Sequence, residues 1–431
     1  MRDPWAQTLK RLRASDTGQA AGLAAAMMVS NVIGLGISVV FARVINDYGA
    51  LAALISYLVI MTVAGQAMQV ATARESVLGT LGEGQQLLDT LASWARSMMI
   101  FGVGATVVSI LARGLIAGAI GVPHQAWAAA AGIPAGAVYL WLCILRGALQ
   151  GVGDYRSVGI SLIGEALTRL TGGTALAVAG LGLTGAYLGS LLAYVAMSAY
   201  ATVMLRRRQR AATGAPAQRY VPVSLARELR AAGIAILALG IIQLLQNVDL
   251  ITAKHRFDET VASSYAVAAV AAKVLIWVAM GAGFHLVPQT SKLSAQHLDA
   301  RGVLLKALAV VVIVAIPCML IFAAAAHPLL AIVFGKRRAV ASASLLPLGV
   351  AFTALAATYL AVQYMLAQRR VWFLAAIGTL AVAEPFLLTL APARPVSFAT
   401  VVLAIQVVGA VITYAVALRP GLPTPAASGP P

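Results

Sequence analysis

The sequence predicts an all-α membrane protein with about twelve transmembrane helices in two groups of six. Hydrophobic residues make up 61% of the 431 residues and charged residues only 10%, whereas an ordinary soluble domain has about 25% charged residues. The mean hydropathy is +0.88. Long apolar runs follow one another along the chain, and a basic polar stretch near the middle separates two sets of them.

Composition also excludes several function classes. One soluble core could not bury this much apolar surface, so lipid must surround most of the chain. The net charge of +17 comes from basic residues between the apolar runs, and aromatic residues are only 6%, which argues against base-stacking platforms for nucleic acid. Cys143 and Cys318 lie within apolar runs, so we expect buried free thiols and no disulfide framework.

A transmembrane helix needs about 20 mostly apolar residues, and twelve runs approach or exceed this length. The first run, from Gly18 to Phe41, is too long for the apolar part of a cleavable signal peptide. Arg113 interrupts the third run near its end. We predict helices near 18–41, 50–73, 97–118, 127–145, 157–179, 182–205, 231–251, 261–287, 303–325, 341–366, 371–390 and 396–418.

Basic residues predict the orientation. With twelve helices, most of the 31 Lys and Arg residues fall on the side that carries both termini, so we place this side in the cytoplasm and the protein in the bacterial inner membrane. The predicted parts are a first bundle over 1–205, a basic cytoplasmic linker over 206–230, a second bundle over 231–418 and a disordered tail over 419–431. We expect the linker to lie on anionic phospholipids.

The two halves are weakly similar to each other. Asn31 precedes Tyr48 in the first half much as Asn247 precedes Tyr265 in the second, with Arg43 between the members of the first pair and Lys254 between those of the second. Glu165 lies in the fifth predicted helix of the first half and Glu384 in the fifth of the second. Repeated halves are typical of transporters, whose substrate path lies at the repeat interface.

Two glycine motifs resemble nucleotide-binding loops. Gly180–Gly185 fits G-x-G-x-x-G, but it joins two apolar helices instead of a strand and a helix, so we predict a tight extracytoplasmic turn with close helix packing. Gly335 and Lys336 resemble the end of a P-loop, but Leu330 stands where the first glycine is needed. We therefore expect no ATP hydrolysis, and transport would use an ion gradient, the membrane potential or substrate flux.

Charged residues within the apolar runs are the strongest functional signal, because a charge at mid-bilayer costs at least about 2.5–3.5 kcal/mol. Glu165 and Arg169 are four residues apart on one helix face and can pair, either as a structural pair or beside a cavity. Lys273 has no acid three or four positions away, so it must find a partner on another helix or face water.

The seventh predicted helix is unusually polar. Gln243, Gln246 and Asn247 form one stripe, with Asp249 beside it, and such a stripe is either a contact between helices or a cavity wall. Glu384 precedes Pro385, so a kinked helix could carry a proton on this carboxyl or use it in packing. No histidine has a metal-binding spacing and no nucleophile motif occurs, so we expect neither metal nor cofactor.

Three segments resemble the multidrug/oligosaccharidyl-lipid/polysaccharide (MOP) exporter superfamily, and within it the Wzx-type polysaccharide flippases. They are Ala42–Ala50 (ARVINDYGA), Leu145–Arg156 (LRGALQGVGDYR), and the segment from Asn247 through Tyr265 and Lys273 to Pro288. The resemblance covers nearly the whole chain, but these motifs are short and rich in glycine. The lipid II flippase branch usually has two more helices than we count here, which argues against a peptidoglycan precursor as cargo.

The resemblance implies two six-helix bundles around a central, V-shaped cavity, alternating access, and a polyprenyl-linked oligosaccharide as cargo. It implies Arg43, Arg146, Asp249 and Lys273 as cavity residues. Basic groups suit the pyrophosphate and amides such as Gln243, Gln246 and Asn247 suit sugar hydroxyls. Glu165, Arg169 and Glu384 are our candidates for ion or proton coupling.

We therefore predict a flippase of polysaccharide biosynthesis, such as that of lipopolysaccharide, working beside a polymerase or glycosyltransferases. One alternative is cation-coupled multidrug efflux, although organic cations prefer an acidic, aromatic pocket. Another is a membrane glycosyltransferase or polymerase, although the loops opposite the linker are short and no Asp-x-Asp motif occurs. We expect no enzymatic activity.

Overall fold

The computed structural model describes residues 16–210, 223–296, 298–368 and 370–419, and the described chain is helical with no strand. The predicted tail, except Arg419, and residues 211–222 of the predicted linker lie outside these residues. The α-helices are α2 (Asp16–Val44), α3 (Tyr48–Met61), α4 (Val63–Val77), α5 (Gln85–Leu111), α6 (Arg113–Ile120), α7 (Ala126–Gly151), α8 (Tyr155–Leu176), α9 (Gly182–Arg210), α10 (Leu225–Ala231), α11 (Gly233–Arg256), α12 (Glu259–Ala295), α13 (Arg301–Phe334), α14 (Leu345–Ala367), α15 (Phe373–Leu390) and α16 (Pro395–Ala417).

The described residues contain eleven segments that are long and apolar enough to cross a membrane. The longest has 55 residues and includes both α8 and α9, which pack against each other. A π-helical turn, Ala177–Leu181, joins them, and Gly180 (φ 103°) and Gly182 (φ 49°) adopt backbone conformations that favour glycine. The chain therefore reverses here, as predicted for this glycine motif, and forms a multi-pass membrane protein with about twelve crossings.

The third predicted helix has different ends in the structure. We predicted 97–118, but α5 begins at Gln85 and ends at Leu111, and α6 starts separately at Arg113. Hydropathy marks only the part of a helix that lies in hydrocarbon, whereas α5 extends about three turns beyond it. The Arg113 guanidinium donates to the Ile110 carbonyl and lies 4.8 Å from the centre of the Trp127 ring. Helix α5 therefore ends just before a charged side chain that binds the end of the helix.

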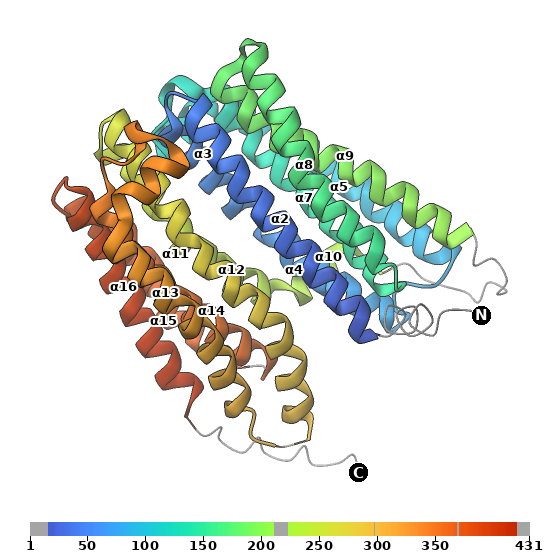
Figure 1. The fold of residues 1–431 in the computed structure, drawn as a ribbon. Helices are drawn as coiled ribbons and strands as arrows, with labels where there is room; N and C mark the ends of the chain where they lie inside the picture. Colours follow the sequence, from blue (N-terminus) through green and yellow to red (C-terminus); the bar gives the residue numbers. More distant parts are fainter. Residues whose placement is uncertain (1–15, 211–222, 297, 369, 420–431) are drawn as a thin grey trace, which may run out of the picture.

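The helices form two halves (Figure 1), α2–α9 and α11–α16. At one end, which we call the loop side, the ribbons of the two halves meet, and α3 packs against α11 and α12. Toward the other end, the terminal side, where α2 begins and α16 ends, the ribbons separate. The short helix α10 contacts both α4 and α11 on this side, and the Trp94 indole on α5 donates to the Val223 carbonyl just before it.

Glycine allows the closest packing of two helices in the first half. A Cβ atom on Gly189 of α9 would lie 2.4 Å from the Gly173 Cα on α8, so we expect Gly189→Ala to lower stability by about 1–3 kcal/mol through overpacking. The check is the melting temperature of the purified protein in detergent. Gly104→Ala is the control, because a Cβ there meets no atom within 4 Å. Equal melting temperatures for the two variants would contradict this account.

Glu228 predicts a pH-dependent attachment of α10. Burial, and then the nearby Glu75, raise the pKa of the Glu228 carboxyl, while Arg227 acts against them. A raised pKa in the folded state means that stability is present at low pH and is lost as pH rises through that pKa. We expect hydrogen-exchange protection in α10, corrected for the intrinsic exchange rate, to be lower at mildly alkaline than at acidic pH. Glu228→Gln should weaken this pH dependence, whereas the control Glu83→Gln, on the exposed turn, should leave it unchanged. An unchanged pH dependence in the Glu228→Gln variant would refute the role of Glu228.

Candidate functional site

Two arginines join the halves on the loop side by exchanging hydrogen bonds with helix ends. The Arg43 guanidinium, in the last turn of α2, donates to the carbonyls of Ile332 and Val333 at the end of α13, with a shortest distance of 2.7 Å. Arg338, which follows α13, donates to the carbonyls of Ala42, Ile45 and Asn46 at the end of α2, at 2.7–3.0 Å. Each cation therefore caps the carbonyl end of a helix in the other half.

An ion pair and a tight backbone contact lie beside these arginines. The Lys254 ammonium of α11 is 2.7 Å from the Asp47 carboxylate, and Asp47 also accepts from the Ala50 amide at the start of α3. The Gly49 amide donates to the Ser263 hydroxyl of α12, and a Cβ on Gly49 would lie 3.0 Å from the Ser263 amide nitrogen. We call the group of Arg43, Asp47, Lys254 and Arg338 the clasp.

Arg146, Glu165 and Arg169 form a buried charged cluster inside the first half. The Arg146 guanidinium on α7 is 2.9 Å from the Glu165 carboxylate on α8 and also donates to the hydroxyl and carbonyl of Ser161. Arg169 pairs with the same carboxylate at 2.7 Å, as its spacing predicted. The Arg146 side chain is 1% exposed and that of Arg169 is 27% exposed, so only Arg169 has appreciable open surface.

Two tyrosines, Tyr139 and Tyr194, lie beside this cluster, and Tyr57 and Tyr187 form a neighbouring pair. The rings of Tyr139 and Tyr194 pack with centres 4.8 Å apart, and the Tyr194 hydroxyl lies 3.2 Å from the Arg169 guanidinium. Tyr57 and Tyr187 pack on α7 at Gly132, where a Cβ would lie 2.1 Å from the Tyr57 ring. Within the described chain, the hydroxyls of Tyr57 and Tyr187 and the Arg169 Nε are buried without a hydrogen-bond partner. The first half thus has unused hydrogen-bonding capacity beside an uncompensated positive charge.

A second polar network lies in the other half, around Lys273 of α12. The Lys273 ammonium is 3.3 Å from the Asn247 amide oxygen and 3.8 Å from the Asp249 carboxylate, both on α11. It also lies 5.4 Å from the centre of the Phe352 ring. The Tyr265 hydroxyl donates to the Asp249 carboxylate at 3.4 Å. Lys273 has therefore found partners on another helix, one of the two possibilities that its isolation in the sequence left open.

The other candidates of this half adjoin the network. The Asn247 amide donates to the Gln243 backbone and side-chain oxygens, whereas the Gln246 side-chain oxygen is buried with no partner among the described residues. Glu384 of α15 is fully buried and accepts from the Gln406 amide of α16 at 3.2 Å. Glu384 also lies within electrostatic reach of both Asp249 and Lys273, so two carboxyl groups share one ammonium.

The two halves consequently carry opposite charge imbalances. With every group ionised, the first-half cluster has two cations and one anion, and the second-half network has one cation and two anions. An uncompensated charge is expensive in hydrocarbon. The first-half cluster therefore favours an anionic ligand, and the second-half network favours a proton or a cation.

The structure divides the sequence candidates among these three places instead of one. Arg43 lies in the clasp, Arg146, Glu165 and Arg169 lie in the first-half cluster, and the remaining candidates lie in the second-half network: Gln243, Gln246, Asn247, Asp249, Lys273 and Glu384. Sequence reasoning missed Arg338, Lys254 and Gln406. Two of these carried a signal: Gln406 is an amide within an apolar run, and Lys254 is a basic residue between Asn247 and Tyr265. Among the described residues, no group of His, Cys, Asp and Glu side chains could hold a metal ion.

Comparison with solved structures identifies the fold. No family model and no curated protein matches the sequence. The lipid II flippase MurJ in an inward closed conformation superposes with a TM-score of 0.72 at 14% identity, over 91% of this chain and 87% of MurJ. An inward-facing multidrug resistance MATE family transporter of the MOP superfamily superposes with 0.65 at 13% identity, over 92% and 97%.

A third structure shows the same architecture. It is a MOP superfamily transporter from Pyrococcus furiosus, described as having a binding pocket of reverse polarity, with a TM-score of 0.60 at 14% identity over 94% and 96%. The chain therefore has the fold of the MOP superfamily transporters, and these structural neighbours are transporters and flippases, not enzymes.

The clasp predicts a coupling between the halves. Asp47→Asn keeps the cap on α3 but removes the charge that Lys254 binds, and Lys254→Met removes the partner. We expect each change to open the loop side about fivefold more often, and the double variant to be no worse than either single one. The measurement is the distance between spin labels at the exposed His124 and Arg337, in a chain without other cysteines. Additive effects would contradict a direct pair.

Proposed function

We propose that the protein is a flippase that moves a polyprenyl-linked oligosaccharide across the bacterial cytoplasmic membrane in polysaccharide biosynthesis. The observation that carries the proposal is the first-half cluster, in which two guanidinium groups share one carboxylate at the depth of the bilayer. A diphosphate group on the cargo would supply the missing negative charge and accept bidentate hydrogen bonds from Arg169. An organic cation would be repelled.

The polar groups around the cluster suit a saccharide. The hydroxyls of Tyr57 and Tyr187 lack partners in the described chain, and each can donate to or accept from a sugar hydroxyl. The likeness to the lipid II flippase MurJ, with a TM-score of 0.72, supports a lipid-linked cargo for this fold. We assign Arg146 to positioning, because it is 1% exposed and its hydrogen bonds hold Glu165 and Ser161 in place.

In this proposal the structure is the state in which the loop side is closed. The clasp holds the loop side together, and the ribbons separate on the terminal side, which the positive-inside rule places in the cytoplasm. Opening the loop side requires the clasp to break, so Arg43 acts in closure and not as a cargo ligand. Proton binding by the Asp249–Glu384 pair beside Lys273 would compensate the negative charge of the second half and supply the coupling.

Cation-coupled drug efflux is the second candidate, and the second-half network favours it. Two buried carboxyl groups with one ammonium could bind a coupling cation, and MATE transporters share the fold. The buried Lys273 and the positive charge of the first half make this alternative weaker.

The decisive experiment is flipping of a fluorescent polyprenyl-diphosphate oligosaccharide in proteoliposomes, read as the lipid accessible to an added lectin. Arg169→Gln should lower the initial rate by about tenfold or more, since it removes charge-assisted hydrogen bonds to the diphosphate, whereas Arg169→Lys should retain part of the rate. Arg146 is a poor first target, because its side chain is 1% exposed and also donates to the hydroxyl and carbonyl of Ser161, so removing it would disturb the packing of α7 against α8 as well as the charge.

Arg113→Gln is the matched control, since it removes one arginine at the loop side, whose guanidinium contacts Ile110 and Trp127 and lies outside the first-half cluster. An unchanged rate for Arg169→Gln at equal protein level would remove the cluster from the cargo path. Uptake of an organic cation driven by a proton gradient, without flipping of the oligosaccharide lipid, would establish the second candidate instead.

A further inference from the structure

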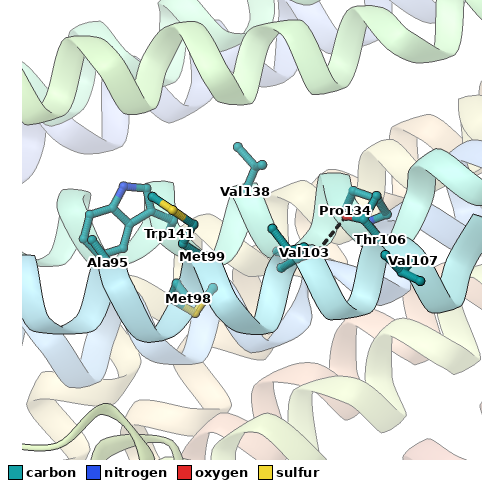
Figure 2. A pocket seen from close by; sticks show the side chains of 11 residues that line it. Ala95, Met98, Met99, Val103, Thr106, Val107, Pro134, Val138 and Trp141 are labelled. Carbon is teal, nitrogen blue, oxygen red and sulfur yellow. Dashed lines mark hydrogen bonds between the residues drawn. The ribbon is translucent and has the colours of Figure 1, made fainter.

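A long apolar groove lies outside the three polar places, on the flank of the first half. Figure 2 shows its walls: Met99, Val103 and Val107 from α5, and Pro134 and Trp141 from α7. Its volume is about 450 Å³. Met99, Val103 and Val107 are 51–68% exposed, so the groove opens toward the bilayer. Thr106, the one hydroxyl among the described residues that line it, donates to the Gly102 carbonyl at 2.6 Å.

A second, polar cavity continues this groove toward the terminal side. It has a volume of about 300 Å³ and lies between α5, α7 and α9, and it shares Ala95 and Trp141 with the apolar groove. Its walls include two exposed charged side chains, Asp89 and Arg206. Gln85 donates to the Asp89 carboxylate at 3.0 Å, but within the described part of the chain neither Asp89 nor Arg206 has an ion pair.

The boundary between the two cavities coincides with a change of composition along α5. Arg96 is the last charged residue of α5, and the helix is apolar or weakly polar from Ser97 to Leu111. Trp141, an aromatic residue with a polar N–H group, lies at the junction. From Ala95 to Val107 the apolar groove runs about 18 Å along α5, close to the thickness of one leaflet, about 15 Å.

We propose that the combined groove binds a single glycerophospholipid whose zwitterionic headgroup ends in a primary ammonium. Its phosphate contacts the Arg206 guanidinium, its ammonium contacts the Asp89 carboxylate, and one acyl chain lies along Met99, Val103 and Val107. We choose this headgroup because of the charges in the polar cavity. Among its described residues, one cation and one anion lack ion pairs, and they match the phosphate and the ammonium of such a headgroup. An anionic headgroup would leave Asp89 unpaired and repelled, and a choline headgroup has no N–H donor for the carboxylate.

This site is separate from the cargo path proposed above, because it is built from α5, α7 and α9 on the bilayer-facing flank and shares no residue with the first-half cluster. The lipid would fill the space between α5 and its neighbours, of which only α7 packs extensively against it within the described chain. The bound lipid is thus a structural ligand, independent of which molecule the protein transports.

The test is native mass spectrometry of the full-length protein in detergent with phosphatidylethanolamine, phosphatidylglycerol and phosphatidylcholine of identical acyl chains. We expect the ethanolamine lipid to be retained about tenfold better than the other two, as one extra charge-assisted hydrogen bond produces. Asp89→Asn should abolish the preference over phosphatidylglycerol, and Arg206→Gln should weaken all three lipids. Val103→Trp should block the groove and lower retention without changing the headgroup preference.

Each variant has a matched control nearby. Glu83→Gln and Arg208→Gln remove exposed charges that do not line the cavity, and Val108→Trp makes the same substitution at an exposed position of α5 that does not line the groove. These three should behave as wild type. Equal retention of the three lipids by the wild-type protein would overturn the proposal. So would a control variant that reproduces the effect of its partner, since binding would then follow general charge or hydrophobicity.

Discussion

Arg43 and Arg338 hold the two halves together by donating hydrogen bonds to backbone carbonyls at helix ends. The last carbonyls of a helix have no intrahelical donor, and they carry the negative end of the helix dipole. Here α2 and α13 end side by side on the loop side, and the arginine of each end neutralises the carbonyls of the other. The contact uses backbone atoms, so it specifies where two helix ends lie and not only which side chains meet. On the terminal side the ribbons of the two halves separate, and the short helix α10 contacts both α4 and α11 there.

The two halves carry opposite uncompensated charges, so they differ in the ligands that each would bind. Arg146, Glu165 and Arg169 leave one positive charge uncompensated, and Asp249, Lys273 and Glu384 leave one negative charge. A purely structural ion pair would have equal numbers of charges, because desolvating an extra one is costly. Transporters tolerate such groups when cargo or a coupling ion completes the count. Glu165 and Glu384 occupy matching helices in the two weakly similar halves. The charges around them nevertheless differ, because Glu165 lies among two cations and Glu384 lies near one cation and a second carboxyl group.

Local patterns in the sequence predicted much of the fold and part of the site. Hydropathy located about twelve crossings, the glycines from Gly180 to Gly185 predicted the reversal between α8 and α9, and the four-residue spacing predicted the pairing of Glu165 with Arg169. Hydropathy did not predict the ends of α5, because the first turns of this helix contain polar and charged residues. It also could not reveal the clasp, because Arg338 lies in a loop with two other basic residues and its partners are carbonyls that every residue possesses.

By itself the sequence determined that lipid surrounds most of this protein, the approximate number and position of its helices, and which charged residues lie within apolar runs. Each of these follows from composition over about 20 consecutive residues. Only the tertiary structure decided the partners of those charges. Arg146 meets Glu165 across a helix pair, Lys273 meets Asn247 across another, and Asp89 and Arg206 face one polar cavity from α5 and α9. These contacts join residues far apart in the chain, and they depend on helix rotation and packing, which hydropathy does not encode.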